Sequence, residues 1–137
     1  MKYVLDTNAV SALMKGDASV AARLRNVNRS EVAIPQPVIA EIAYGIARLP
    51  RSGHRQRLLE RFELVCAEFA RAQWTDAVSG RFGAIKATLE VRQGRRVEDF
   101  DAAIAAHALE ADATLVTANR DGMAKIPGLK TEDWARR

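Results

Sequence analysis

The sequence contains 137 residues, of which 48% are hydrophobic and 28% charged, a globular composition that excludes a disordered chain. This length suits a single domain over residues 1–137 that buries roughly two-thirds of its unfolded surface. The net charge of +4 and the pI of 9.6 favour a polyanionic partner such as nucleic acid.

The first half of the chain predicts two strands separated by helices. Residues 3–5 are apolar and β-favouring, so we predict a strand that ends at Asp6. Pro35 stops the second strand, and Pro37 suits the first turn of a helix. The other predicted elements are helices over 7–14 and 17–26, a strand over 31–34, and helices over 37–48 and 54–71.

The second half continues the alternation of strands and helices. The predicted elements are a very short strand over 73–75, a helix over 76–93 ended by Gly94, a helix over 100–111 capped by Asp99, a strand over 113–117, a turn at Asp121-Gly122, and an edge strand over 129–131. Trp134 is expected to pack against the body of the protein. Such alternation predicts an α/β fold with a mainly parallel sheet covered by helices on both faces.

No feature of the sequence indicates a membrane or secretory protein. No apolar run reaches the roughly 18 residues of a transmembrane helix, and no apolar segment follows a basic start, so we expect a cytoplasmic protein. Cys66 is the only cysteine, and its apolar surroundings indicate a core residue. For His54 and His107 we expect structural or surface roles, because neither has a second ligand at the spacing of a zinc motif.

Three carboxylates are candidates for one site. Asp6 is predicted at the carboxyl end of a strand, which is the ligand-binding edge of open α/β sheets, although helix capping alone could explain it. Glu41 lies about 110° from the centre of the apolar face of its helix, so it could enter a cleft or be an ordinary boundary residue. Asp99 and Asp101 cannot share a face. Asp99 suits the cap, which leaves Asp101 for the site or for a plain first-turn acid preference.

Two polar residues follow the last long strand and are predicted at the same edge. Thr117 could donate a hydrogen bond to Asp6, and Asn119 could hold a metal-bound water, or either could simply shape the turn. Oxygen ligands without cysteine or paired histidine favour Mg²⁺ or Mn²⁺ over zinc. Carboxylates around such ions can hydrolyse phosphodiester bonds.

The basic residues are mostly arginine, which accounts for 16 of the 21 and suits bidentate contact with phosphate. The main cluster and the two pairs are Arg48, Arg51, Arg55, Arg57 and Arg61, then Arg95-Arg96 and Arg136-Arg137. We predict that Arg55 and Arg57 contact RNA; the alternative is a solvated helix face balanced by glutamates.

Four motifs occur in order along nearly the whole chain: Tyr3-Val4-Leu5-Asp6-Thr7-Asn8, Glu41-Ile42-Ala43-Tyr44-Gly45, Asp101-Ala102-Ala103-Ile104-Ala105-Ala106-His107-Ala108 and Leu115-Val116-Thr117-Ala118-Asn119. Together they resemble the PIN-domain ribonucleases, specifically the VapC/FitB-type toxins of bacterial toxin-antitoxin pairs. The resemblance implies a three-layer α/β/α fold, a homodimer, and inhibition by a small antitoxin that binds DNA. It also implies Mg²⁺- or Mn²⁺-dependent endoribonuclease activity on tRNA or another structured RNA.

By the same resemblance, the metal-binding and catalytic acids are Asp6, Glu41 and Asp101, supported by Thr117 and Asn119. One departure concerns a fourth acid, which relatives often carry followed by phenylalanine. Gly122 and Met123 occupy those two places here, and Asp121 stands one residue early. We therefore expect Asp121 to take part only as an outer-sphere residue.

Three alternatives belong to other functional classes. A PIN-like domain that binds RNA or a partner without cleaving is compatible with the missing fourth acid. A haloacid-dehalogenase-type phosphatase needs a second aspartate two residues after Asp6, where this chain has Asn8. A receiver-like signalling module needs a mid-chain strand-end aspartate and a late strand-end lysine, and neither stands out.

Overall fold

The computed structural model describes residues 1–135, so the Arg136-Arg137 pair lies outside the described residues. Its centre is a sheet of five strands in the order β3-β2-β1-β4-β5, and every neighbouring pair is parallel. The strands are β1 (Tyr3–Leu5), β2 (Val32–Pro35), β3 (Ala70–Ala72), β4 (Thr114–Val116) and β5 (Lys130–Glu132). The predicted parallel sheet is confirmed.

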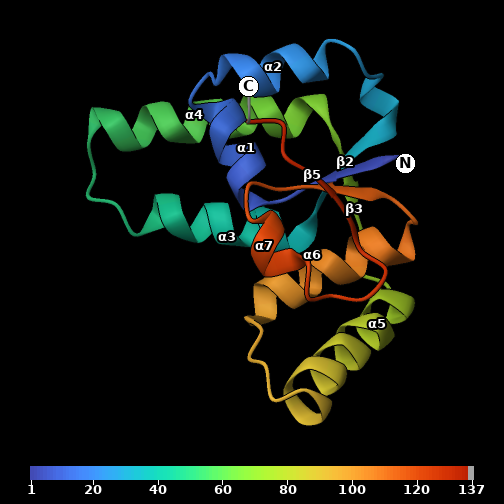
Figure 1. The fold of residues 1–137 in the computed structure, drawn as a ribbon. Helices are drawn as coiled ribbons and strands as arrows, with labels where there is room; N and C mark the ends of the chain where they lie inside the picture. The colour runs from blue at the N-terminus through green and yellow to red at the C-terminus, as the bar shows by residue number, and fades with distance from the viewer. Residues whose placement is uncertain (136–137) are drawn as a thin grey trace.

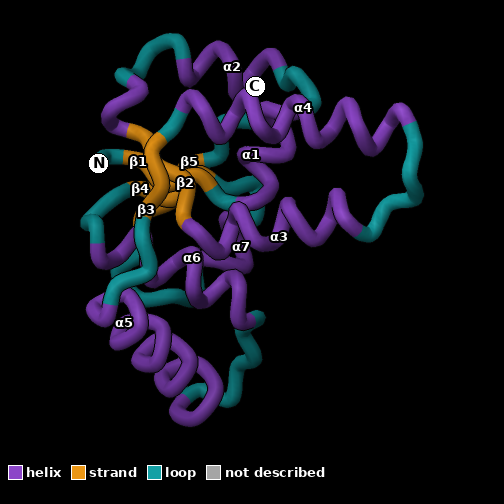
Figure 2. The backbone as a smooth tube through the Cα atoms, turned by 180° about the vertical axis from the view of Figure 1, so that it is seen from behind, coloured by secondary structure: helices purple, strands orange, loops and turns teal. Residues whose placement is uncertain are grey.

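Helices cover both faces of the sheet, which confirms the three-layer α/β/α architecture (Figures 1 and 2). One layer holds α1 (Thr7–Met14), α2 (Ala18–Leu24) and α4 (Gly53–Glu68), and the other holds α5 (Asp76–Lys86) and α6 (Asp99–Glu110). The remaining helices are α3 (Gln36–Ala47), α7 (Arg120–Met123), the 3-10 turn η1 (Arg29–Glu31) and the π-helical segment η2 (Ala87–Arg92). Because α3 contacts both α1 and α6, it joins the two layers.

The strand order creates a switch point between β1 and β4. From β1 the chain builds outward to β2 and β3, then crosses to the other side of β1 to form β4 and β5. Tyr3 pairs with Val32 on one side and with Thr114 on the other. In open parallel sheets the crevice at such a point, beyond the carboxyl ends of the strands, is where ligands bind. Asp6 follows β1 and Thr117 follows β4 at this edge.

The strand predicted over 73–75 is wrong, because β3 lies three residues earlier at Ala70–Ala72. Correspondingly, α4 ends at Glu68 rather than at residue 71. Phe69 explains the error: it continues the apolar helical spacing and is buried, yet its backbone is already extended (φ −122°, ψ 145°). Phe69 is buried in an extended connection, but its spacing from the preceding apolar residues is that of a helix, so the pattern predicts one helical turn too many.

The prediction that Asp99 caps α6 is also wrong. The residue at the cap is Glu98, which makes no side-chain capping bond, and Asp99 is the first residue of the helix. Asp99 binds Lys86 at 2.7 Å instead. At Asp121-Gly122 the structure has the short helix α7 in place of a simple turn. Gly94, with φ +64°, ends the preceding helix in the left-handed conformation, as predicted.

The core is aliphatic and runs through both layers, with the side chains of Val4, Leu5, Leu115 and Ile104 fully or almost fully buried. Trp134 is 1% exposed, which confirms that the C-terminal tail packs against the body. Within residues 1–135, no helix is long and apolar enough to cross a membrane.

Candidate active site at the switch point

Asp6 is buried where β1 passes into α1. It is the N-cap residue of α1, and its Oδ1 accepts a hydrogen bond from the backbone N–H of Ala9 at 2.9 Å. The Asp6 backbone N–H donates to the carbonyl of Val116 at 3.1 Å, which ties this turn to β4. Only 4% of Asp6 is exposed. Capping is therefore real, but an exposed aspartate would cap equally well, so capping does not account for the burial.

The electrostatic surroundings of Asp6 oppose its ionisation. Burial raises its pKa from the ordinary value of 3.8 to about 6, and the negative charge of Asp101 adds to the rise. Hydrogen bonds from Thr117, Ala9 and Asn8 offset part of it. No basic side chain of the described residues is among the groups that shift this pKa. A buried carboxylate that lacks a counter-charge is a natural partner for a cation.

Asp101 lies in the first turn of α6, close enough for its charge to raise the pKa of Asp6. It is half-buried, and burial and the neighbouring Glu98 raise its pKa, while the charge of Lys125 lowers it. The two aspartates come from opposite layers of the fold, one from the β1–α1 turn and one from α6. The sheet edge thus brings together two of the three predicted acids, Asp6 and Asp101.

Glu41 lies on the second turn of α3 and is positioned by Thr7. The Thr7 hydroxyl donates to Oε1 of Glu41 at 2.6 Å, which turns this carboxylate toward the residue that follows Asp6. Glu41 and Thr7 also line an apolar cleft of about 250 Å³ between α1, α3 and α4, with Lys15 at its border. Glu41 therefore occupies a cleft wall rather than an ordinary boundary position.

The loop after β4 is tied to the site by hydrogen bonds. Thr117 is 1% exposed, and its side chain lies close enough to Asp6 to lower the pKa of that carboxyl. Its Oγ1 also accepts from the backbone N–H of Asn119 at 3.0 Å. The side chain of Asn8 accepts from the N–H of Ala118 at 2.9 Å. The loop and the start of α1 are therefore held as one unit around the Asp6 carboxylate.

For Asn119 the sequence leaves two alternatives, holding a metal-bound water or shaping the turn, and in the structure it shapes the turn. Its Oδ1 accepts from the backbone N–H of Gly122 at 3.2 Å and so caps α7. A Cβ atom at Gly122 would lie 2.5 Å from Nδ2 and 2.6 Å from Oδ1 of Asn119. Any side chain at position 122, including an acid, would therefore have to displace Asn119 from the cap.

Replacing Gly122 with alanine tests this crowding. Glycine to alanine in a helix normally stabilises by about 0.5–1 kcal/mol, but here the lost Asn119 cap costs about 1 kcal/mol. We expect no gain, or a small loss, in the free energy of unfolding by urea. Gly80→Ala in α5 is the matched control, because its added Cβ meets nothing within 4 Å and should stabilise. Equal stabilisation by both substitutions would show that position 122 is not crowded.

Asp121 is exposed and lines a different cleft, of about 350 Å³, with Arg120 and Asp133. It is absent from the groups that shift the pKa of Asp6. An outer-sphere role for Asp121 stays a prediction.

The donor set fits a hard divalent cation. Asp6, Glu41 and Asp101 offer only oxygen atoms, and the uncompensated charge of Asp6 calls for a cation. Among residues 1–135, however, no three histidine, cysteine, aspartate or glutamate side chains stand close enough to hold a metal ion as they are. Metal binding would therefore require the carboxylates to draw together or water to complete the ligand shell, as Mg²⁺ commonly demands.

The two predicted RNA-contacting arginines differ in their surroundings. Arg55 is half-buried, and its Nε donates to the carbonyl of Ile46 at 3.2 Å, so it links α4 to α3. Arg57 is exposed.

Four residues around the site carry contacts that the sequence did not predict. They are Thr7, Asn8, Lys15 and Lys125, none of which the sequence predicts as part of the site. The contacts of the first two and of Lys125 join segments far apart in the chain. A local pattern cannot reveal such contacts, because they arise only when the layers pack.

Comparison with known proteins identifies relatives over the full length. The profile of the PIN domain family matches residues 3–129. The chain is 31% identical to the tRNA(fMet)-specific endonuclease VapC of Shigella flexneri, over 98% of this chain and 99% of that one. VapBC2 from Rickettsia felis, solved bound to a promoter DNA fragment, has a TM-score of 0.87 with 26% identity and coverage of 98% and 99%. DNA-bound VapBC from Salmonella typhimurium has a TM-score of 0.86 with 27% identity and coverage of 98% of both chains.

Proposed function

Because the chain belongs to the PIN domain family, we propose that it is a metal-dependent endoribonuclease that acts as the toxin of a toxin-antitoxin pair. The observation that carries the proposal is Asp6, a buried carboxylate at the switch point of the sheet whose pKa is raised by burial and by the charge of Asp101, with no basic side chain of the described residues to offset it. The activity named for the Shigella flexneri relative, cleavage of a tRNA, agrees with this chemistry.

Asp6, Asp101 and Glu41 would hold Mg²⁺, with Mn²⁺ as an alternative. When bound, such an ion polarises the scissile phosphate, lowers the pKa of a water molecule and neutralises charge in the transition state. Thr117 and Asn8 orient the Asp6 carboxylate, and Thr7 orients Glu41. These bonds fix the direction of oxygen atoms that would otherwise rotate, which is the usual role of residues behind metal ligands.

Basic side chains near the acids would bind the RNA backbone. Lys15 borders the cleft that contains Glu41, and Lys125 lies close enough to lower the pKa of Asp101. Arg57 is exposed on α4 and free to reach phosphate, whereas Arg55 would have to leave the Ile46 carbonyl first. We therefore propose Arg57 over Arg55 as an RNA contact.

The proposed partners follow from the relatives. The Rickettsia felis and Salmonella typhimurium structures are VapBC assemblies bound to DNA. For this chain we propose a small DNA-binding antitoxin as inhibitor, a homodimer as the toxin unit, and the cytoplasm as the location.

A cleavage assay tests the function. Purified protein is freed of metal with EDTA and incubated with transcribed initiator tRNA, and with total tRNA, in the presence and absence of Mg²⁺ or Mn²⁺. We expect endonucleolytic products only when metal is restored. RNA binding without cleavage would favour the non-cleaving alternative, and cleavage that is indifferent to EDTA would contradict the proposed metal site.

The variants Asp101→Asn and Asp99→Asn assign the activity to the site. We expect Asp101→Asn to slow cleavage by at least about 100-fold, because a lost metal ligand removes several kcal/mol of transition-state stabilisation. Asp99 is two residues away on another face of α6, and asparagine keeps an Oδ1 that can still accept from Lys86, so Asp99→Asn should be far less sensitive. If both variants cut as fast as the wild type, Asp101 does not belong to the site.

A further inference from the structure

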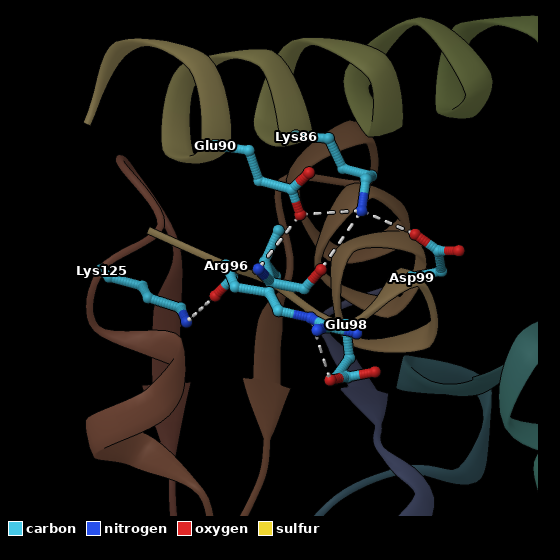
Figure 3. Close-up of polar contacts among 7 residues, drawn as sticks. Lys86, Glu90, Arg96, Glu98, Asp99 and Lys125 are labelled. Atoms are coloured by element: carbon cyan, nitrogen blue, oxygen red, sulfur yellow. Dashed lines mark hydrogen bonds and ion pairs between the residues drawn. The ribbon is translucent and has the colours of Figure 1, made fainter. Parts of the chain in front are cut away.

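The connection between η2 and α6, residues 93–98, is held by two charged side chains of the preceding helix. Lys86 Nζ donates to Glu90 Oε2 at 2.9 Å, to the Val97 carbonyl at 3.2 Å and to Asp99 Oδ1 at 2.7 Å (Figure 3). Glu90 Oε2 also accepts from the Val97 N–H at 3.2 Å. Lys86 and Glu90 thus bind both backbone polar groups of Val97, whose side chain is buried.

The order of this pair argues against a purely helical role. Lysine four residues before glutamate is the less favourable arrangement on a helix, so the pair contributes little to the helix that carries it. The other contacts of Lys86 and Glu90 are with Val97 and Asp99, outside the helix that carries the pair. The hydrogen bond to Asp99 is the largest cause of the raised pKa of Lys86, and the bonds from Lys86 and Val97 lower the pKa of Glu90. Lys86 and Glu90 also line a cleft of about 490 Å³ with residues 94–99.

These contacts determine where α6 begins. The cap residue Glu98 makes no side-chain capping bond, so the first turn of α6 is not fixed by its own N-cap. Lys86 fixes this turn from the neighbouring helix by binding Asp99, the first residue of α6. Asp101 stands two residues later in the same turn, so its carboxylate direction depends on where this turn is held. From the other side, Lys125 binds the Arg96 carbonyl at 2.8 Å (Figure 3).

We propose that Lys86, together with Glu90, is a positioning residue for Asp101: it holds the first turn of α6 so that the Asp101 carboxylate can meet Asp6 around a divalent cation. This inference rests on the proposed nuclease function. According to this proposal, the continuous helix formed by α5 and η2 contributes to metal binding indirectly, although Lys86 and Glu90 do not contact Asp6 or Asp101.

Lys86→Met tests the role with metal binding as the first readout. Mn²⁺ is titrated calorimetrically into metal-free protein, and cleavage of transcribed initiator tRNA is measured separately. We expect the Mn²⁺ dissociation constant to rise about 10-fold or more, as for other residues behind metal ligands. We also expect kcat to fall while KM for RNA stays unchanged, because Lys86 is bound to acids and not free for phosphate. Lys86→Arg keeps a cation for Asp99 and Glu90 and should recover most of the loss.

Arg81→Met is the matched control. Arg81 is also on α5 and pairs with Glu110 of α6, but it does not reach the 93–98 connection. It should leave Mn²⁺ binding and kcat unchanged, and urea unfolding in EDTA checks that all variants fold. Wild-type Mn²⁺ affinity in Lys86→Met, or equal loss in Arg81→Met, would overturn the positioning role. A wild-type protein that neither binds Mn²⁺ nor cleaves RNA would overturn the proposed function itself.

Discussion

Substitution of Asp6 by asparagine is expected to reduce metal-dependent RNA cleavage by at least about 1000-fold and, at neutral pH, to make the metal-free protein more stable. The loss follows from removal of the charged ligand that is buried deepest, since metal catalysis supplies several kcal/mol. The gain follows from the energetic cost of the buried carboxylate. Asparagine keeps the α1 cap, because it is as good a capping residue as aspartate.

The gain in stability depends on pH in a defined direction. Asp6 has a pKa of about 6 in the folded protein and an ordinary value of 3.8, so between these values the folded state binds more protons than the unfolded state. The contribution of Asp6 to the stability of the metal-free wild type therefore falls as pH rises through this interval. The full penalty, about 3 kcal/mol, applies above pH 6. Asp6→Asn avoids it, so the difference between the two proteins should vanish near pH 4 and be largest above pH 6.

Urea unfolding in EDTA at pH 4.5 and 7.5 measures this difference in stability. When Mn²⁺ is added in place of EDTA, it should strongly stabilise only the wild type, because only the wild type binds it well. Asp17→Asn is the matched control, because Asp17 caps α2 by accepting from Ser19 and Val20 but is not fully buried. It should change stability little at either pH. A metal-free Asp6→Asn protein that is less stable than the wild type at pH 7.5 would show that the carboxylate is compensated by other groups.

The position of Asp6 could be predicted because the signals that place it are local. Three apolar β-favouring residues precede it, a helix follows it, and parallel strands bring their carboxyl ends to one edge. The same reasoning predicts Thr117 beside it, and the Thr117 side chain lies close enough to lower the pKa of Asp6. Asp101 is preferred over Asp99 in the sequence because Asp99 is expected to cap the helix, but the structure has Glu98 at the cap, so that reason is wrong and the role of Asp101 stays a prediction.

The rest of the site depends on packing between distant segments. The Thr7 hydroxyl meets Glu41 34 residues away, and neither residue type nor spacing signals the contact. The edge strand β3 is predicted three residues too late for a related reason. Its alanines carry no β pattern, and Ala33 and Pro35 of β2 pair with them through the backbone alone. Arg55 was predicted to face RNA, yet an arginine in a basic cluster can equally donate to a carbonyl of the neighbouring helix, as it does here.

Replacing Trp134 with alanine is expected to destabilise the protein by about 3–5 kcal/mol, the usual cost of emptying a large aromatic site in a core. Trp134 is 1% exposed and packs edge-on against Tyr3 of β1 at 5.1 Å between ring centroids. Its indole N–H donates to Glu132 at 3.0 Å, and the guanidinium of Arg23 lies over its ring. The tail therefore holds β5, β1 and α2 together, and all three lose a partner when the ring is removed.

The comparison with Trp74→Ala shows whether the loss of stability depends on the burial of Trp134 or only on removing a tryptophan. Trp74 is 44% exposed and packs against Phe82 and His107, so its removal should cost far less, about 1 kcal/mol. Urea unfolding in EDTA gives both values, and a loss below that of Trp74→Ala would mean that the tail is dispensable. Because Trp134 lines a small cavity with Asn8 and Thr117, the alanine variant also opens space behind the residues that orient Asp6. Its Mn²⁺ affinity should therefore fall even where the protein remains folded, whereas Trp134→Phe, which refills most of that space, should retain it.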